Sequence, residues 1–171
     1  MGCDGSAGAR RRILIVCHAN TSRSIIAEAL LAKMLQARRR DDVLVRSGGI
    51  APYARDSSLV SLDARLTLRD DAIDIPADRT ACDLKRHRHH LAEADLILTM
   101  TVEQKRMLEA FSEAAGKEVL TLKELAGESG DIEDPAGQGA EYHRTCRDEI
   151  RRCLEKAIDR VAPPRRAAGA R

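Results

Sequence analysis

Aromatic side chains are nearly absent from this chain of 171 residues, which has no tryptophan, one phenylalanine and two tyrosines. Its core must therefore be aliphatic. No run of sequence approaches the ~20 apolar residues that span a bilayer, so no transmembrane segment is predicted. The net charge is only +2, which argues against nucleic-acid binding as the main role. With 43% hydrophobic and 33% charged residues, the composition predicts one domain with a proper core.

The five cysteines exclude two kinds of architecture. Their number is odd, and Cys3, Cys82, Cys146 and Cys153 show no paired spacing of the kind that holds zinc. We therefore expect neither a disulfide framework nor a metal site. Such cysteine usage is typical of a reducing compartment, so the sequence predicts a cytoplasmic protein.

Apolar runs of strand length alternate with longer segments of helical periodicity. The strands are expected at residues 13–17, 43–47, 96–100 and 118–120, and the helices at residues 23–38, 57–72, 84–91, 102–115 and 140–161. In the last helix Cys146 and Cys153 belong to an apolar stripe and are expected in the core. This alternation predicts the α/β class. We expect a single three-layer domain, a four-stranded parallel sheet with helices on both faces, and a site at the carboxyl ends of the strands.

The two ends of the chain differ in composition from its middle. Residues 1–11 are rich in glycine, alanine and arginine, and residues 162–171 repeat that mix, so both are expected to be flexible basic tails around a domain at residues 12–161. Residues 1–6 also fit a short N-myristoylation pattern, with Cys3 as a palmitoylation candidate. We expect an unmodified terminus, no membrane association, and a monomer or weak dimer.

The strongest signal follows the first predicted strand. Residues 17–24 read Cys-His-Ala-Asn-Thr-Ser-Arg-Ser and lead directly into the first predicted helix. Loops of this size can point successive backbone N–H groups at one spot, and the helix start adds partial positive charge there. We therefore expect this segment to hold a phosphate-like dianion.

Four side chains of this loop have the chemistry of a nucleophilic site. Cys17 stands among N–H donors and near an arginine, which favours its nucleophilic thiolate form. Arg23 offers paired planar donors that match two phosphate oxygens. Ser24 carries a hydroxyl that can donate to the sulfur, and Asn20 would brace the loop from inside.

Asp134 is the candidate general acid. The following residue, Pro135, disfavours helical conformation at Asp134, so the carboxylate is presented from a stiff loop before the last helix. It can protonate a leaving group and later take a proton from water. A cysteine and an arginine five residues apart occur by chance in many chains, and Asp-Pro alone is a turn signal. The strand, the helix and the distal carboxylate together favour catalysis over packing.

These pieces resemble the low-molecular-weight protein-tyrosine phosphatases over nearly all of residues 12–161. Other matching segments are residues 27–29, 47–49, 94–100 and 134–135. The resemblance implies a hydrolase of phosphorylated protein side chains that uses no metal or other cofactor, with Cys17 as nucleophile, Arg23 as phosphate clamp and Asp134 as acid. The residues expected to contact phosphate or substrate are His18, Ala19, Asn20, Thr21, Ser22, Ser24 and Tyr53.

Thr21 bears on the choice of substrate. The resemblance is closest to the bacterial protein-arginine phosphatases, a branch of this family with threonine at this loop position, where tyrosine-specific relatives usually carry a bulky aliphatic residue. Those relatives also often place aromatic residues after the Asp-Pro, where this chain has Ala136 and Gly137. Only Tyr53 stands where the family often has an aromatic pocket wall. Threonine in a tight loop can also simply bond its own backbone. Phosphoarginine is slightly favoured, and phosphotyrosine is the alternative.

Three further features qualify this resemblance. Ser22 stands where family members commonly have a second cysteine, so no protective disulfide with Cys17 is expected. His18 is expected at the pocket rim or surface, with its side chain turned away from the loop. The basic run at residues 85–90 is expected on a short surface helix, as a solvated face.

Two rival functions belong to other classes. Arsenate reductases share this fold and loop but relay oxidation through further cysteines, and no cysteine lies between Cys82 and Cys146. A binding module that holds phosphate without turnover is the second rival. It is disfavoured because the nucleophile, the clamp and the acid are all present.

Overall fold

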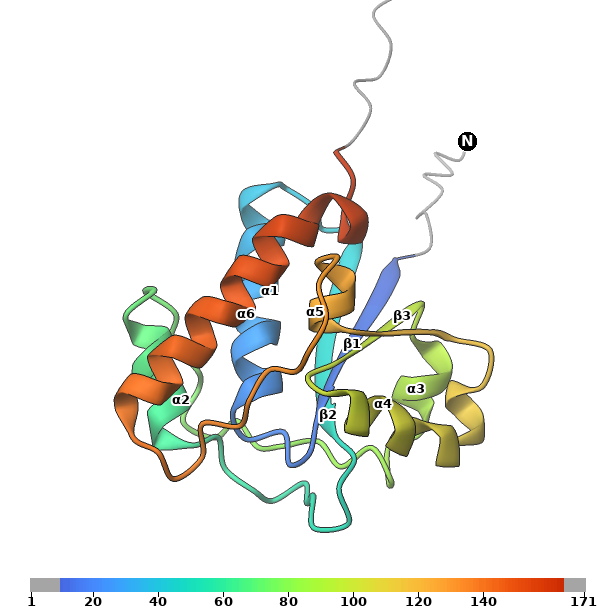
Figure 1. The fold of residues 1–171 in the computed structure, drawn as a ribbon, viewed down its shortest axis with the longest axis horizontal. Coiled ribbons are helices and arrows are strands. Elements are labelled where there is room, and N and C mark those ends of the chain that lie inside the picture. The colour runs from blue at the N-terminus through green and yellow to red at the C-terminus, as the bar shows by residue number, and fades with distance from the viewer. Residues whose placement is uncertain (1–9, 165–171) are drawn as a thin grey trace, which may run out of the picture.

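Four parallel strands form the centre of the computed structural model, which describes residues 10–164. They are β1 (Arg11–Cys17), β2 (Val43–Gly49), β3 (Leu96–Thr99) and β4 (Glu118–Thr121), in the spatial order β2-β1-β3-β4. All four carboxyl ends therefore lie at one edge of the sheet, the lower edge in Figure 1. The predicted four-stranded parallel sheet is confirmed.

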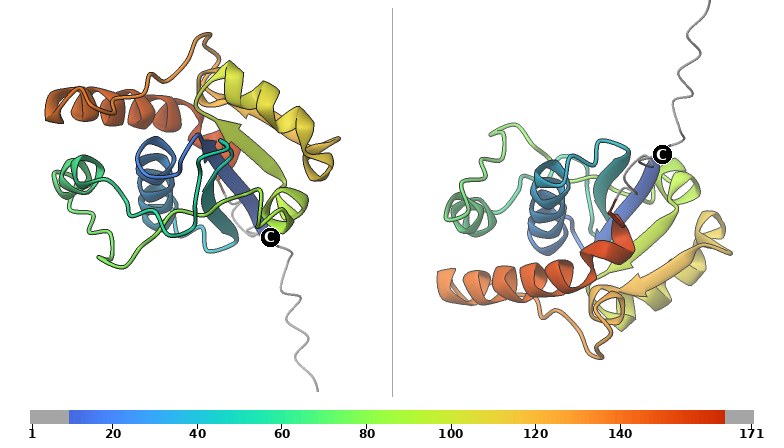
Figure 2. Two further views of the ribbon diagram at one scale, coloured as in Figure 1. Left: turned by 90° about the horizontal axis from the view of Figure 1, so that it is seen from below. Right: turned by 90° about the horizontal axis from the view of Figure 1, so that it is seen from above.

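Helices cover both faces of this sheet. The helices are α1 (Arg23–Ala37), α2 (Leu62–Arg69), α3 (His89–Glu93), α4 (Val102–Met107), α5 (Leu122–Leu125) and α6 (Ala140–Val161), with 3-10 turns at Leu108–Ala110 and Ser112–Ala114. Figure 2 shows α1, α2 and α6 on one side of the strands and α3 and α4 on the other. Along β1, Ile13 and Ile15 enter the first layer of core, whereas Leu14 and Val16 enter the second. A strand buried on both faces in this way explains the unbroken apolar run that marks it in the sequence.

The last predicted helix is confirmed. It spans Ala140–Val161, and both Cys146 and Cys153 are buried in the core beneath it. The first helix was expected to end at residue 38 and ends at Ala37. In these two helices a long apolar stripe sets the structure, which is why periodicity alone finds them.

The helices predicted at residues 57–72 and 84–91 are wrong in extent. The helix expected at 57–72 is confined to Leu62–Arg69, because the Ser61 hydroxyl accepts a hydrogen bond from the backbone of Ala64 and caps the helix there. Residues 84–88 form a turn rather than a helix, since the backbone carbonyl and carboxylate of Asp83 accept hydrogen bonds from the next amides. Helix α3 begins only at His89.

The segment expected as one helix at 102–115 is also divided. Helix α4 ends at Met107, and Phe111, which separates the two 3-10 turns along the chain, is extended and buried in the second layer of core. Helix α5 was not predicted. It begins at a capping box in which the Thr121 hydroxyl and the Glu124 side chain each bond the other's backbone N–H.

The chain ends are described only in part. Strand β1 already includes Arg11, and Ala162 is buried after α6. Residues 1–9 and 165–171, which hold most of the tails predicted at 1–11 and 162–171 and the acylation pattern at residues 1–6, fall outside the described residues. Within residues 10–164, none of the helices combines the length and apolar character needed to cross a membrane.

Candidate active site

The segment between β1 and α1 turns its carbonyl groups outward. The carbonyls of Cys17, His18 and Thr21 accept hydrogen bonds from the amides of Ile50 (3.2 Å), Ala51 (3.0 Å) and Ser61 (2.9 Å), respectively. Within residues 10–164, the amides of Ala19, Thr21 and Ser22 have no acceptor. A loop fixed by its carbonyls leaves N–H groups for a ligand at its centre, and the N-terminus of the 15-residue helix α1 reinforces their positive potential.

The Cys17 sulfur lies inside this loop at the carboxyl end of β1. The sulfur is 3.0 Å from the Ser24 hydroxyl and accepts a hydrogen bond from the backbone N–H of Asn20 at 3.2 Å. Cys17 is only 4% exposed, so these two contacts are made away from bulk water. Donors placed around a sulfur stabilise negative charge on it both as a nucleophile and as a leaving group.

Asn20 lies beneath the loop and is held there by its backbone and its side chain. Its backbone has φ 59°, in the left-handed region that asparagine tolerates better than most residues. Its side-chain amide donates to the hydroxyls of Ser24 (2.8 Å) and Ser47 (2.9 Å), and its carbonyl oxygen accepts from the Cys82 backbone amide at 2.8 Å. Asn20 therefore ties the loop to β2 and to the segment before α3.

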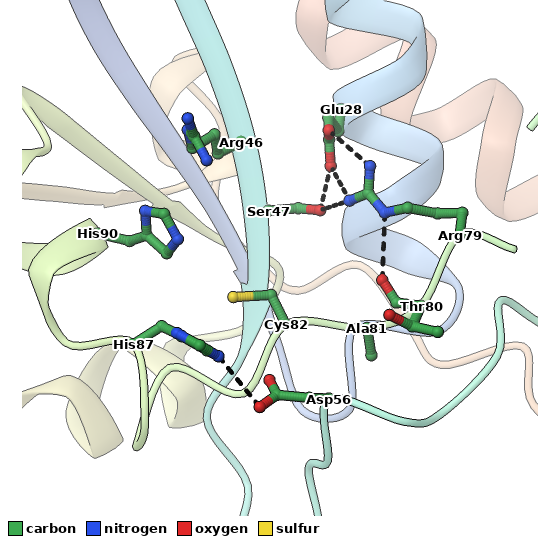
Figure 3. Close-up of a pocket in the computed structure, with 10 residues that line it drawn as sticks. All are labelled: Glu28, Arg46, Ser47, Asp56, Arg79, Thr80, Ala81, Cys82, His87 and His90. Carbon is green, nitrogen blue, oxygen red and sulfur yellow. Dashed lines mark hydrogen bonds and ion pairs between the residues drawn. The ribbon is translucent and has the colours of Figure 1, made fainter. Parts of the chain in front are cut away.

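The ion pair of Glu28 and Arg79 supports Asn20 through the Ser47 hydroxyl. The Ser47 hydroxyl donates to the Glu28 carboxylate, and Arg79 bonds the same carboxylate at 2.9 Å (Figure 3). Glu28 comes from α1 and Ser47 from β2, so the network joins two elements of the core. It fixes which way the Ser47 hydroxyl points and thereby the position of the Asn20 amide.

Arg23 is buried and tethered at both ends of its guanidinium group. Nη1 donates to the backbone carbonyl of Ile132 at 2.8 Å, and Nη2 lies 3.4 Å from the Asp134 carboxylate and 3.3 Å from Nδ1 of His18. The side chain is only 4% exposed, whereas that of Asp134 is 51% exposed. A planar cation held in this way presents a fixed set of donors to a dianion at the loop centre.

Asp134 reaches the site on the loop before α6. The backbone amide of Ile132 donates to the Met100 carbonyl at 2.8 Å, which fastens this loop to the end of β3. The Ala136 amide bonds the Asp134 carboxylate at 3.1 Å, and Gln138 bonds the Asp134 carbonyl at 3.1 Å. The sequence therefore brings Asp134 beside Arg23 although 111 positions separate them.

His18 is half-buried and turns toward Arg23 rather than away from the loop. Its Nδ1 is 3.3 Å from Arg23 Nη2 and 3.2 Å from Gln104 Nε2. Both partners are donors, so Nδ1 accepts and the ring proton lies on Nε2, which faces Glu103 at 3.7 Å. Gln104 was not singled out from the sequence. Its only signal is the capping box with Thr101 at the start of α4.

A cavity of about 340 Å³ opens above the sulfur. Of the predicted site residues, it is lined by Cys17, His18, Ala19, Thr21, Ser22, Arg23, Tyr53 and Asp134. Asn20 and Ser24 are fully buried behind the sulfur, so they contact Cys17 rather than the cavity. The Ser22 hydroxyl is buried without a hydrogen-bond partner among the described residues. This is an orphaned polar group at the place where an oxyanion would bind.

Five further residues line the cavity: Ser61, Asp63, Ala136, Gly137 and His143. Of these, Ser61, Asp63 and His143 were not singled out from the sequence. Ser61 and Asp63 lie at the start of α2, His143 lies in the first turn of α6, and Ala136 follows the Asp-Pro pair without an aromatic wall. Tyr53 is 63% exposed and is the one aromatic side chain among the lining residues. Serine is a common residue at a helix start, so a cap such as Ser61 can be recognised in the sequence. That this helix start faces the cavity depends on the fold.

The basic run at residues 85–90 is not simply a solvated face. The Lys85 ammonium donates to the carbonyls of Ala51 (2.7 Å) and Ala54 (3.2 Å), and His87 Nε2 lies 3.0 Å from the Asp56 carboxylate. These contacts hold the loop after β2 against the segment that precedes α3. The turn at Asp83 makes them possible, because it faces Lys85 toward that loop.

The remaining described cysteines, Cys82, Cys146 and Cys153, are free thiols in environments unlike that of Cys17. Burial raises the pKa of the Cys146 thiol to about 12, although the charge of Arg23 acts in the opposite direction. Burial and the neighbouring Asp56 carboxylate raise the pKa of Cys82 to about 11. Both thiols are therefore protonated at neutral pH.

Known proteins with similar sequences are phosphatases. The family model described as low molecular weight phosphotyrosine protein phosphatase matches residues 12–166. A protein-arginine-phosphatase of Geobacillus stearothermophilus is 39% identical over 153 residues, which cover 88% of this chain and 93% of the relative. A low molecular weight protein-tyrosine-phosphatase PtpB of Staphylococcus haemolyticus (strain JCSC1435) is 32% identical over 139 residues, covering 81% and 91%.

A solved structure agrees with the sequence relatives. A mutant of the YwlE arginine phosphatase with a phosphorylated active-site serine has a TM-score of 0.79 to this chain, with 29% identity and coverage of 90% of this chain and 97% of that one. The resemblance inferred from the sequence is thus confirmed. With the family model matched over nearly the whole chain, this protein phosphatase belongs to the low molecular weight phosphotyrosine protein phosphatase family.

Proposed function

We propose that this protein hydrolyses phosphoarginine in proteins through a phosphocysteine intermediate. Cys17 attacks phosphorus as a thiolate, forming an S–P bond while the bond from phosphorus to the substrate nitrogen breaks. Arg23 and the loop amides hold the three equatorial phosphoryl oxygens. Asp134 donates its proton to the departing guanidine nitrogen. The observation that carries this scheme is the sulfur of Cys17 between Ser24 and the Asn20 amide, beneath Arg23 and Asp134.

The second step returns the enzyme to its starting state. Asp134, now a carboxylate, takes a proton from a water molecule as that water attacks phosphorus and the S–P bond breaks. The Ser24 hydroxyl, 3.0 Å from the sulfur, stabilises the departing thiolate. Inorganic phosphate leaves, and the proton on Asp134 is the one needed for the next cycle.

The cavity walls favour phosphoarginine over phosphotyrosine. Thr21 lines the cavity with a small polar side chain, and Ala136 and Gly137 leave its far wall without an aromatic ring. The Asp63 carboxylate also lines it and can accept hydrogen bonds from the nitrogens of a phosphoarginine guanidinium group that carry no phosphate. The relative named a protein-arginine-phosphatase supports the same choice at 39% identity. Phosphotyrosine hydrolysis is the second candidate, supported by Tyr53 in the cavity wall and by the PtpB relative.

The experiment is a side-by-side measurement of kcat/KM on one peptide sequence that carries either phosphoarginine or phosphotyrosine. We expect the wild-type protein to prefer the phosphoarginine peptide. Thr21→Ile should lose phosphoarginine activity by about 10-fold or more while keeping or gaining phosphotyrosine activity, because the added alkyl group fills the space beside phosphorus and packs on an aryl ring.

Two controls separate the causes of such a switch. Thr21→Val keeps the shape of threonine and removes only the hydroxyl, so it tells whether bulk or polarity decides. Release of the leaving group in a burst, equal to the enzyme concentration, tests the phosphocysteine scheme for either substrate. A wild-type preference for the phosphotyrosine peptide would overturn the choice of phosphoarginine and leave the scheme of two steps intact.

The proposal extends to the setting of the enzyme. A thiol nucleophile without a partner cysteine in its own loop works best where thiols stay reduced, so we infer a cytoplasmic location. We also infer a monomer or weak dimer, which sedimentation of the purified protein would test. Phosphorylated proteins are the expected substrates, because the matched family and the relatives are protein phosphatases.

A further inference from the structure

A second cavity lies on the other side of Asn20 from the Cys17 cavity. It has a volume of about 420 Å³ and is lined by Glu28, Arg46, Ser47, Asp56, Arg79, Thr80, Ala81, Cys82, His87 and His90 (Figure 3). Ser47 and Cys82 hydrogen bond the Asn20 side chain, so this cavity shares a wall with the loop that carries Cys17. Neither the proposed mechanism nor the substrate uses this space.

Three different ligand types converge in this cavity. One atom each of Asp56 (carboxylate oxygen), Cys82 (sulfur) and His87 (ring nitrogen) lie within 4.8 Å of one another. Figure 3 shows the Cys82 sulfur and the His87 ring directed into the space above the Asp56 carboxylate. The three residues come from separate segments, the loop after β2, the strand-like stretch near residue 82 and the turn before α3, so sequence spacing does not reveal them.

The ligand atoms are already held in place. Asp56 Oδ1 accepts the Asp83 amide at 2.7 Å, which leaves Oδ2 facing His87 Nε2 at 3.0 Å. The backbone of Cys82 is fixed on both sides, since its amide donates to Asn20 and its carbonyl accepts the Gly49 amide at 2.8 Å. Outer hydrogen bonds of this kind orient metal ligands and are the usual sign of a preformed site.

We propose that Asp56, Cys82 and His87 bind a divalent cation of the zinc class. A thiolate, an imidazole and a carboxylate form the donor set that zinc prefers, and calcium or magnesium would require oxygen ligands. Binding replaces the hydrogen bond between His87 Nε2 and Asp56 by one metal bond to each residue. The Nε2 proton moves to Nδ1 by exchange with solvent, and the thiol proton of Cys82 passes to solvent. Three protein ligands leave a fourth position open to the cavity, where water completes the tetrahedron.

The charges around the cluster set a limit on affinity. Arg86 lies 3.8 Å from Asp56 Oδ2, and the exposed Arg46 lines the same cavity, so both oppose a cation. Glu28 neutralises Arg79, and Asp83 pairs with Lys85, so the other nearby cations are already balanced. Binding to the three ligands must outweigh the repulsion between the metal ion and two arginines, so we expect moderate affinity. We therefore expect a site that fills when metal is available and a chain that folds without it.

The experiment is a titration of the full chain with cobalt(II), followed by displacement with zinc. A thiolate-to-cobalt charge-transfer band should grow to one equivalent and disappear when zinc is added. Zinc should also raise the melting temperature, because the folded chain alone assembles the three ligands. Cys82→Ser should abolish the band, and His87→Ala should weaken cobalt binding by about 100-fold or more.

Matched variants assign the band to this cavity. Cys17→Ser should keep the band, which excludes the thiol in the other cavity, and Cys153→Ser should keep it as a second thiol control. His89→Ala, which alters a neighbouring exposed histidine outside the cluster, should leave affinity unchanged. Loss of the band in Cys17→Ser, its survival in Cys82→Ser, or the absence of any band in the wild-type chain would each overturn the proposal.

Discussion

Cys17 and Cys146 are both buried thiols in range of the same guanidinium group, yet their surroundings give them opposite chemistry. Cys17 lies at a strand end, where a hydroxyl and a backbone amide point at its sulfur. Cys146 lies in the second turn of α6, where its sulfur contacts the Glu133 carbonyl at 3.8 Å and burial raises its pKa to about 12. The nearby Arg23 is not sufficient to make a nucleophile. Oriented donors in contact with the sulfur are what distinguish the two sites.

The largest expected effect is the loss of activity when the Cys17 thiol is replaced, with replacement of the Cys146 thiol as the comparison. Cys17→Ser should lower kcat on a phosphoprotein substrate by at least about 10³-fold, because the hydroxyl is a far weaker nucleophile in the same place. Cys146→Ala should keep kcat within about threefold, since its sulfur faces the core. Steady-state kinetics with both variants checks the comparison. Equal activity losses would contradict it.

Asp134→Asn should have the next largest effect. The amide keeps the shape of the carboxylate and cannot donate a proton to the leaving group, so kcat should fall by about 10²- to 10⁴-fold. The loss should be smaller with an activated substrate such as an aryl phosphate whose leaving group needs no proton. Rapid-quench measurement with both substrates gives the comparison, and an equal loss with each would assign Asp134 to positioning of Arg23 alone.

Two neighbouring glycines test whether the shape of the loop matters as much as its side chains. A Cβ on Gly49 would lie 2.7 Å from the His18 carbonyl oxygen and 2.8 Å from the Ala19 carbonyl carbon, whereas the atoms nearest to one on Gly48 all belong to the side chain of Leu84. Both alanine variants should lose stability by about 1–3 kcal/mol through overpacking. Gly49→Ala should also lower kcat by about 10-fold, because it displaces the backbone that turns N–H groups inward.

Denaturation midpoints and kcat of the folded protein separate the two effects. Gly48→Ala should keep nearly wild-type kcat once folded. If both variants lost activity to the same degree, the carbonyl contacts of the loop would not be what shapes it.

The smallest expected effect is a pH dependence of stability that belongs to Cys146. An unperturbed thiol ionises near 9.0, whereas this one is held to about 12 in the folded chain. The unfolded chain therefore binds fewer protons above about pH 9, so the stabilising contribution of Cys146 is complete below pH 9 and declines as pH rises toward 12. Urea unfolding of the wild-type chain and Cys146→Ala at about pH 8 and about pH 11 measures it. The wild-type advantage should shrink at the higher pH, and a constant difference would contradict it.

Long apolar patterns and local loop chemistry were enough to predict much of this protein. The run from Ile13 to Val16 is buried on both faces and is correctly predicted as a strand, and the stripe of Cys146 and Cys153 correctly predicts α6. The loop at residues 17–24 is recognisable because its nucleophile, clamp and helix start are consecutive. Where a single side chain decides the backbone, as at Asp83 or Phe111, periodicity overestimates the helix.

By itself the sequence determined the strand segments and the loop with Cys17 and Arg23, because each depends on residues close together along the chain, and its motifs taken together identified the family. Only the tertiary structure decided that Asp134 meets Arg23, that Gln104 orients His18, and that Asp56, Cys82 and His87 share one cavity. Contacts between distant segments depend on how strands are ordered and where loops return, and no local pattern encodes the distance between two such side chains.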